Sequence, residues 1–346
     1  MSRMETCSLC IQTTKTKNHV DSHLGISDRR VQNRCLETVV SNRLFRIFAL
    51  AVVALLILAV VVTLDLAPRQ PFALPSVVLH FVSPAVAYHP RGFSPQNADS
   101  RVNAQSIVRD LELLRESGFR SIVTYSSQGV LGSVPQLARH AGFDGVVIMG
   151  LWDPWSEEEW RKAVEQAANV DGFCLGNEGL GVRYEPNKLA SRMNALRTLT
   201  GKPVTTSEPI DSYLNGPHRQ WLLENSDWLF PIAHPFLAAE HDPGRGVTWI
   251  SSRYDYLASN NTKIVILKEV GIPSAGSTHV NESSQVAFFK ALEATGMFFF
   301  YFEAFDQPWK TAVPKGNTIE AHWGIFRKDG TPKELATWLK NHRARR

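Results

Sequence analysis

The segment GFCLGNE, residues 172–178, is an apolar run that ends in an amide and a carboxylate. The segment KIVILKE, residues 263–269, repeats this pattern, because a β-branched run suited to a buried strand stops at a glutamate. The carboxyl ends of parallel strands in a closed barrel meet on one rim. If both runs belong to one such barrel, Glu178 and Glu269 point into the same mouth from facing sides.

Six further apolar, β-branched or aromatic runs occur after residue 84, and segments of helical periodicity separate them. The eight predicted strands cover residues 85–88, 121–125, 145–150, 172–175, 203–207, 228–233, 263–268 and 297–302. The predicted helices include residues 105–117, 156–168, 185–200, 283–295 and 332–342. Alternating units of this kind predict the α/β class and a parallel sheet, either a (β/α)8 TIM barrel or a doubly wound open sheet.

The positions of the polar clusters favour the barrel. Nearly every unusual polar or aromatic cluster comes directly after a predicted strand, as Trp152-Asp153-Pro154-Trp155 and His234-Pro235-Phe236 do. Active sites of barrels lie at this end of the strands. The first strand is not followed by a Gly-rich phosphate loop, which counts against a nucleotide-binding sheet.

An apolar segment precedes this domain. Residues 47–64 run without a charge, long enough to cross most of a bilayer core, and predict one transmembrane helix. Arginines are concentrated before this helix, so the positive-inside rule places residues 1–46 in the cytoplasm. The low periodicity of these residues predicts a disordered tail. Three prolines within residues 65–83 predict an extended linker, and residues 84–346 form the barrel on the periplasmic or extracellular side of the cell membrane. A cleaved signal peptide ending at Ala85-Val86-Ala87 is the alternative.

Charge and cysteine content exclude several classes of function. Residues 1–46 hold eight Lys and Arg against four Asp and Glu, so the remaining residues sum to zero charge and lack the basic stripe of a nucleic-acid-binding protein. After the apolar helix the only cysteine is Cys174, which predicts no disulfide within the domain. No metal-ligand spacing or G-x-S-x-G elbow occurs, so we expect catalysis without a metal, a cofactor or a serine nucleophile.

Two carboxylates on facing strands are what retaining glycoside hydrolysis requires. One carboxyl group protonates the leaving oxygen and the other attacks the anomeric carbon. Asn177 adds an amide that can hold a sugar 2-hydroxyl, although a turn residue is the alternative reading. Either glutamate alone could instead cap a helix or form a salt bridge at the rim.

Aromatic rings after the strands supply apolar faces for the C–H surfaces of a pyranose. These rings are Tyr88, Tyr125, Trp152, Trp155, Phe236, Trp309 and Trp323, some of which belong to the core.

At these residues the sequence resembles glycoside hydrolase family 17, the β-1,3-glucanases, and its bacterial and fungal branch more than the plant enzymes. LGNE ending at Glu178 resembles the family's V-G-N-E acid/base motif, and KEVGIPS resembles S-E-T-G-W-P-S, which carries the nucleophile at Glu269. FEAFDQPWK and EAHWGIF are similar to F-E-A-F-D-E-P-W-K and W-G-L-F. The resemblance implies substrate-binding roles for Asp306, Lys310, Glu320 and Trp323. Position directly after a predicted strand adds six further candidate substrate-binding residues, which are Tyr88, Tyr125, Asn177, His234, Phe236 and Trp309.

The resemblance implies retaining hydrolysis of β-1,3-glucan through a covalent glycosyl-enzyme at Glu269. A β-1,3-glucanosyltransferase that remodels envelope glucan is the alternative, and a non-catalytic glucan-binding protein is a further one. Two departures bear on the substrate. Ile272 replaces the usual Trp, which should weaken one sugar subsite, and Gln307 replaces a common acid, which should alter the coupling of nearby pKa values.

Overall fold

The computed structural model describes residues 76–95, 102–238, 241–312 and 317–343. Each predicted strand run overlaps an observed parallel strand. The strands are β1 (Ala85–Ala87), β2 (Ser121–Val123), β3 (Val147–Leu151), β4 (Gly172–Leu175), β5 (Val204–Thr205), β6 (Ile232–Ala233), β7 (Leu267–Val270) and β8 (Phe299–Tyr301).

The strands form one eight-stranded sheet in the order β5-β4-β3-β2-β1-β8-β7-β6. The two end strands approach each other, because a parallel bridge joins Pro209, just after β5, to Ile232 of β6, and Ile232 N–H donates to the Glu208 carbonyl at 3.0 Å. The sheet therefore curls on itself, in agreement with the predicted (β/α)8 barrel and not with an open doubly wound sheet.

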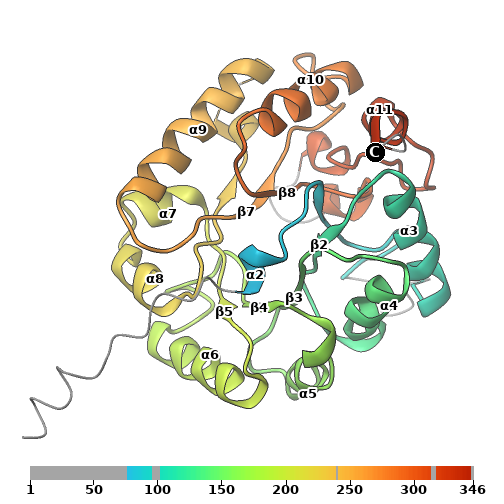
Figure 1. The fold of residues 1–346 in the computed structure, drawn as a ribbon. Coiled ribbons are helices and arrows are strands. Elements are labelled where there is room, and N and C mark those ends of the chain that lie inside the picture. Colours follow the sequence, from blue (N-terminus) through green and yellow to red (C-terminus); the bar gives the residue numbers. More distant parts are fainter. Residues whose placement is uncertain (1–75, 96–101, 239–240, 313–316, 344–346) are drawn as a thin grey trace, which may run out of the picture. The chain divides into compact units, whose positions relative to one another are not determined.

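Helices surround the curled sheet (Figure 1). They are α3 (Ala104–Glu116), α4 (Val134–His140), α5 (Glu157–Glu165), α6 (Pro186–Thr200), α7 (Ile210–Leu214), α8 (Arg219–Asn225), α9 (Pro243–Ser259), α10 (Glu282–Glu293) and α11 (Glu334–Arg343). Short 3-10 turns add η1 (Gly129–Ser133), η2 (Ala167–Asn169), η3 (Pro235–Ala238), η4 (Pro308–Ala312) and η5 (Thr318–Ala321). Local capping sets the helix ends: Ser156 Oγ caps α5 by accepting from Glu159 N–H, and α6 stops at Gly201, whose φ of 66° favours glycine.

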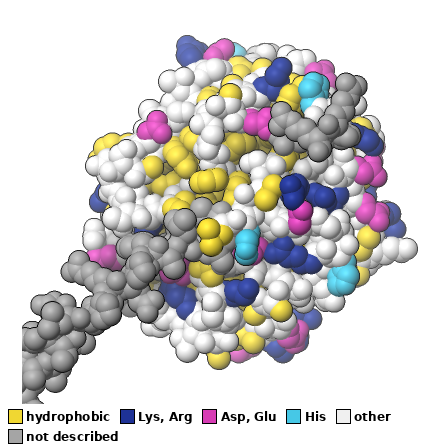
Figure 2. All heavy atoms as spheres, viewed as in Figure 1, with side chains coloured by type: hydrophobic (Ala, Val, Ile, Leu, Met, Phe, Trp, Pro, Cys, Tyr) yellow, Lys and Arg dark blue, Asp and Glu magenta, His cyan; other side chains and the backbone are white. Residues whose placement is uncertain are grey.

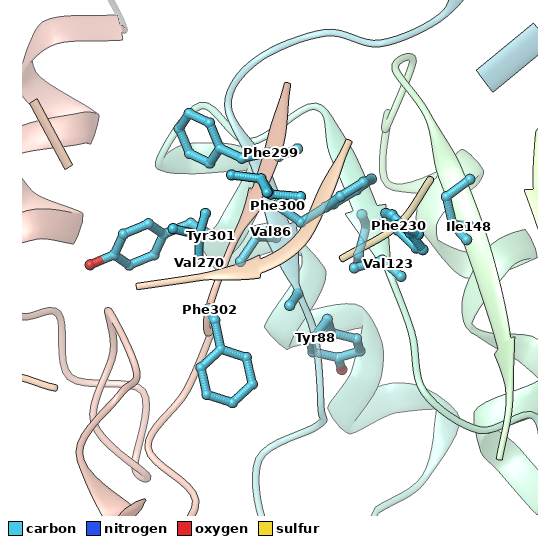
Figure 3. Packing of buried hydrophobic residues seen from close by; sticks show 14 of the residues in the cluster. Val86, Tyr88, Val123, Ile148, Phe230, Val270, Phe299, Phe300, Tyr301 and Phe302 are labelled. Carbon is cyan, nitrogen blue, oxygen red and sulfur yellow. The ribbon is translucent and has the colours of Figure 1, made fainter. Parts of the chain in front are cut away.

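Both faces of each strand are buried, one against the interior of the sheet and one against the helices. Along β8, Phe299 and Tyr301 contact Phe289 of α10, whereas Phe300 packs on Phe230 (Figure 3). Phe299 and Phe300, which fall in the predicted strand 297–302, are nearly inaccessible to solvent and belong to the core. Because side chains alternate between the two faces of the strand, Phe302 is the next residue after Phe300 to face the interior. It lies at the rim of the sheet.

The described end of the predicted linker is not an extended spacer. Residues Ser76–Leu79 form the short helix α2, which lies across the end of the sheet in Figure 1, and Val77 is fully buried. The His80 ring contacts Asp171 at 2.8 Å, and Val82 N–H donates to Ser121 Oγ. The folded domain consequently begins before residue 84, because this segment covers apolar side chains at the start of the strands.

The predicted tail and transmembrane helix, residues 1–64, lie outside the described residues. Among the residues that are described, no helix has the length and apolar character that a membrane span requires. On the face of the domain shown in Figure 2, cationic and anionic side chains are interspersed around the surface. That face therefore presents no field of a single sign, as the charge balance of the sequence predicts.

Candidate active site

The acid/base candidate Glu178 is held by a tight local backbone arrangement. It lies just after β4 with φ of 51°, and its N–H donates to the Ser207 carbonyl at 2.9 Å. The Glu208 carboxylate accepts hydrogen bonds from the N–H groups of Gly179 and Leu180, both at 2.8 Å. A residue in this left-handed conformation is costly unless its surroundings fix it, and these three bonds do so.

The nucleophile candidate Glu269 lies in β7 at an irregularity of the sheet. The register between β7 and β8 shifts between Leu267 and Val270, so the strand bulges at Lys268 and Glu269. Bulges re-aim side chains that strict alternation would send to opposite faces. Both Lys268 and Glu269 accordingly reach the same group of polar residues.

Glu269 is buried among cationic and ring groups. Its Oε2 lies 3.4 Å from His234 Nε2, and its Oε1 lies 3.8 Å from Lys268 Nζ. Burial by itself would raise the pKa of Glu269, but the His234 contact and the charges of Lys268 and Lys310 outweigh it and hold this pKa below its ordinary value. Glu269 is therefore kept ionised, as a nucleophile must be.

The pKa of Glu178 shifts in the opposite direction. Partial removal of its carboxyl group from water and the negative charge of Glu269 raise the pKa of Glu178 above its ordinary value. Two carboxyl groups whose surroundings separate their pKa values can take the roles of acid and anion. This division matches the roles that the sequence motifs imply for Glu178 and Glu269.

Asn177 contacts Glu178 and Lys268, the residue that precedes Glu269. Its Nδ2 lies 3.4 Å from Glu178 Oε2, and its Oδ1 accepts a hydrogen bond from Lys268 Nζ. Lys268 also lies 4.6 Å from the centroid of the Tyr125 ring. Asn177 and Tyr125 thus both lie beside the carboxylates.

A third buried carboxylate, Glu303, completes the group. It follows β8, has no solvent exposure, and accepts a hydrogen bond from Lys310 Nζ at 2.6 Å. His89 Nδ1 lies 3.7 Å from its other oxygen, and the His89 ring stacks on Tyr125 with centroids 4.1 Å apart. Sequence reasoning placed Lys310 here but missed Glu303, Lys268 and His89.

We call this set the central cluster. Its members are His89, Tyr125, Asn177, Glu178, His234, Lys268, Glu269, Phe302, Glu303, Lys310 and Trp323.

The central cluster holds polar atoms that no other described residue satisfies. Trp323 joins it through its ring, 4.9 Å from that of His234. Within the described part of the chain, the buried side-chain atoms without a hydrogen-bond partner include His89 Nδ1, Tyr125 Oη, His234 Nδ1, Glu269 Oε1, Glu303 Oε2 and Trp323 Nε1. Buried polar groups are rarely left unpaired, so several together mark a place where water or a polar ligand supplies the missing partners. A sugar presents hydroxyl groups that can donate to the carboxylates and accept from the ring N–H groups.

Two predicted substrate residues lie outside this cluster. Tyr88 is buried between β1 and α3, and its hydroxyl donates to Asp110 at 3.1 Å, so it faces the helices and not the glutamates. Asp306 binds Lys333 Nζ at 2.6 Å and accepts from Gly324 N–H at 3.0 Å. These side chains are committed to internal partners, so we expect neither to contact the substrate.

We expect Asp306→Asn to reduce stability without impairing substrate binding. Lys333 would be left as a buried charge without its counter-ion, which costs about 3 kcal/mol or more. The unfolding midpoint in urea should fall, while the KM of the folded protein should stay within about twofold of wild type. A large rise in KM at unchanged stability would restore Asp306 to the substrate site.

Three other predicted residues lie nearer the periphery. The Trp309 ring contacts His89 edge-on at 6.1 Å and its Nε1 donates to Gln307 at 3.0 Å, so it borders the cluster. Phe236 packs instead on His241, with ring centroids 4.6 Å apart. Glu320 is half-buried in η5, and among the described residues no recorded interaction joins its side chain to the cluster.

Gln307 has a structural use that an acid could not serve. Its Nε2 donates to the carbonyl of His89 at 3.2 Å while its Oε1 accepts from Trp309. A carboxylate offers acceptors only, so it could not make the first bond. The amide thereby fixes His89 and Trp309 together at the edge of the cluster.

Comparisons with known proteins identify the family of the chain. The family model described as the BtgE/BtgC glycoside hydrolase domain matches residues 85–324. The chain is 25% identical over 298 residues to a probable glucan endo-1,3-beta-glucosidase, btgC, of Aspergillus clavatus, covering 72% of this chain and 41% of that protein. The chain therefore spans about two fifths of the length of that relative.

Solved structures show the same fold. An endo-laminarinase from Formosa Hel1_33_131 superimposes with a TM-score of 0.63 at 20% identity, covering 78% of this chain and 88% of that one. A glycoside hydrolase family 17 beta-1,3-glucanosyltransferase from Rhizomucor miehei superimposes with a TM-score of 0.59 at 21% identity, covering 72% of this chain and 95% of that one.

Proposed function

Because the chain belongs to the BtgE/BtgC glycoside hydrolase family, we propose that it is a retaining glycosidase that cleaves β-1,3-glucan, with Glu269 as nucleophile and Glu178 as acid/base. Membership confirms the family resemblance drawn from the motifs. The observation that carries the proposal is the pair of carboxyl groups with oppositely shifted pKa values among unpaired buried polar atoms. The names of the glucan-active relative and structural neighbours support the choice of substrate.

The reaction follows from this division of roles. Glu269 attacks the anomeric carbon while the bond to the leaving oxygen breaks and Glu178 transfers its proton to that oxygen. A glycosyl ester on Glu269 results. Glu178, now a carboxylate, takes a proton from a water molecule whose oxygen attacks the anomeric carbon and releases Glu269. Two displacements at one carbon retain the β configuration.

The direct test is product analysis of the full chain with short β-1,3-gluco-oligosaccharides. Shorter products with β configuration at the new reducing end, seen early in the reaction by NMR, support a retaining hydrolase. Products of α configuration would contradict the mechanism. No change in the oligosaccharides would leave a glucan-binding protein as the better explanation.

One surface feature favours transfer to a second sugar as an additional outcome. Trp152 and Trp155, after β3, are 43% and 39% exposed, unlike the buried Tyr125 and Trp323. Arg183 lies 4.2 Å from the centroid of the Trp152 ring, and Trp155 stacks on Tyr184 at 5.9 Å. We call Trp152 and Trp155 the tryptophan pair.

The tryptophan pair is tied to the backbone beside the acid/base. The Tyr184 hydroxyl donates to the Trp152 carbonyl at 3.0 Å and accepts from Asn177 N–H at 3.4 Å. Since Glu178 protonates the leaving oxygen, a sugar next to it occupies the leaving-group or acceptor side. An acceptor glucan stacked here would compete with water for the glycosyl ester, as in a β-1,3-glucanosyltransferase.

Replacing the tryptophan pair by alanine should weaken recognition of long chains. Loss of aromatic stacking should raise KM for a pentasaccharide about tenfold and reduce any products longer than the substrate, with little effect on a disaccharide. Initial rates across chain lengths measure this. Tyr256→Ala, which removes a 54% exposed ring from α9, is the matched control and should change none of these values. Equal losses for both lengths would exclude a role of the pair in chain recognition.

We also propose that residues 47–64 anchor the chain in the cell membrane, with the N-terminus cytoplasmic and the catalytic domain outside. The support is the charge-free apolar sequence and the arginines before it. The chain should sediment with membranes, resist carbonate extraction, and expose its domain to protease added to intact spheroplasts. Release as a shortened soluble protein would instead indicate a cleaved signal peptide.

A further inference from the structure

Lys268 is a charged side chain in a position where charge is costly. It is only 1% exposed and directly precedes Glu269, whereas the S-E-T-G motif that this segment resembles has serine there. Burying an ammonium group is unfavourable unless close partners compensate it. The groups that stabilise the buried charge of Lys268 therefore indicate the role of this side chain.

Within the part of the chain that the structure describes, Lys268 has close partners but no carboxylate within hydrogen-bond distance. Nζ donates to the neutral Asn177 Oδ1 and lies 4.6 Å from the Tyr125 ring centroid, while Glu269 Oε1 stays 3.8 Å away, beyond a normal hydrogen bond. Its charge thus acts on Glu269 through space. Glu269 Oε1 itself has no hydrogen-bond partner among the described residues and remains free to attack.

We propose that Lys268 is a positioning residue that holds the Asn177 amide in its working orientation and keeps Glu269 ionised across the active pH range. The inference rests on the proposed glycosidase function. An ammonium group has donors only, so Asn177 must present its oxygen to Lys268. Its Nδ2 is thereby left toward Glu178, where it can donate to a sugar hydroxyl.

The bulge in β7 makes this arrangement possible. In a regular strand Lys268 and Glu269 would point to opposite faces, so only one of them could reach the central cluster. The shifted register lets both side chains reach the central cluster. Two consecutive residues of one strand thus supply the anion and the charge that stabilises it.

Several other groups act on the same charges and must be considered in any pH dependence. Around Lys268 and Glu269 they come from β4, from the ends of β1, β2, β5, β6 and β8, and from η4. They are His89, Tyr125, Cys174, Glu178, Glu208, His234, Glu303 and Lys310.

Two substitutions separate the two roles of Lys268. Lys268→Met keeps the length of the side chain but removes both the charge and the hydrogen bond to Asn177. Lys268→Gln removes the charge but keeps an amide donor for Asn177. Lys333→Met is the matched control, because Lys333 is also a buried lysine, 3% exposed, whose ion pair with Asp306 lies outside the central cluster.

The pH dependence of kcat/KM on a β-1,3-gluco-oligosaccharide is the first readout. Without the Lys268 charge the pKa of Glu269 rises, so the acidic limb should move up by about one pH unit or more in both Lys268 variants. Lys268→Met should also lose about tenfold or more in kcat, because the contact of Asn177 with the sugar strengthens in the transition state. Lys333→Met should move no limb.

The second readout needs no turnover. Carboxyl carbons of glutamate, labelled with ¹³C in the full chain and assigned with Glu269→Gln, report the titration of Glu269 directly. A higher Glu269 pKa in Lys268→Met or Lys268→Gln supports the proposal even if the wild type proves inactive. Inactivity of the wild type would contradict only the proposed function. If a folded Lys268 variant showed neither a shift in the pKa of Glu269 nor a shift in the acidic limb of kcat/KM, the proposal would be overturned. Lys268 would then be a structural residue.

Discussion

Glu269→Ala should lose more than about 10⁴-fold in kcat on β-1,3-glucan and recover activity in azide, with α-glucosyl azide as the product. Removing the nucleophile leaves a space in which a small anion can attack the anomeric carbon. Only one displacement then occurs, so the configuration inverts. NMR of the azide product identifies its anomeric configuration and therefore the face from which Glu269 acts.

A glutamate far from the site provides the control. Glu116, in α3, is exposed and paired with Lys340, so Glu116→Ala should keep wild-type kinetics and give no azide product. A β-glucosyl azide from Glu269→Ala would assign Glu269 to the acid/base role instead. Residual glucan hydrolysis near the wild-type rate would show that neither role belongs to Glu269.

The two glutamates could be singled out because each ends an apolar run, a contrast that a single sequence displays. The same contrast located the eight strands, since a strand with both faces buried is an almost continuous apolar run. Glu303 lacked that contrast. It stands within FFYFEAF, where flanking aromatic residues make the segment look like core, and only its place in the quoted family segment could have indicated it.

The direction of a side chain was harder to predict than its place along the chain. Tyr88 and Tyr125 both follow a strand, but Tyr88 faces α3 and Tyr125 faces the glutamates. Alternation cannot tell the two faces apart when both are apolar. Lys268 was missed for a related reason, because the bulge that lets both Lys268 and Glu269 reach the central cluster depends on the pairing of β7 with β8.

Glu178→Gln should separate proton donation from binding. The amide cannot protonate the leaving oxygen, so kcat/KM on β-1,3-glucan should fall by about 10²- to 10⁴-fold. An aryl β-glucoside with an acidic phenol leaves without protonation, so its glycosylation step should stay within about tenfold of wild type. Pre-steady-state release of the phenol measures that step separately from the slow hydrolysis of the glycosyl ester.

The pH profile and the azide product give independent checks on the same residue. Glu178 acts first as an acid, so its raised pKa sets the basic limb of kcat/KM, and the wild type loses activity as pH rises through that value. In Glu178→Gln this limb should vanish for the aryl substrate, while the acidic limb set by Glu269 remains.

Azide should accept the glycosyl group from Glu269 and give the β product, opposite to that of Glu269→Ala. If the basic limb persisted unchanged in Glu178→Gln, another group would have to be the acid, and Glu303 would be the first carboxyl group to test because it is the third one in the central cluster.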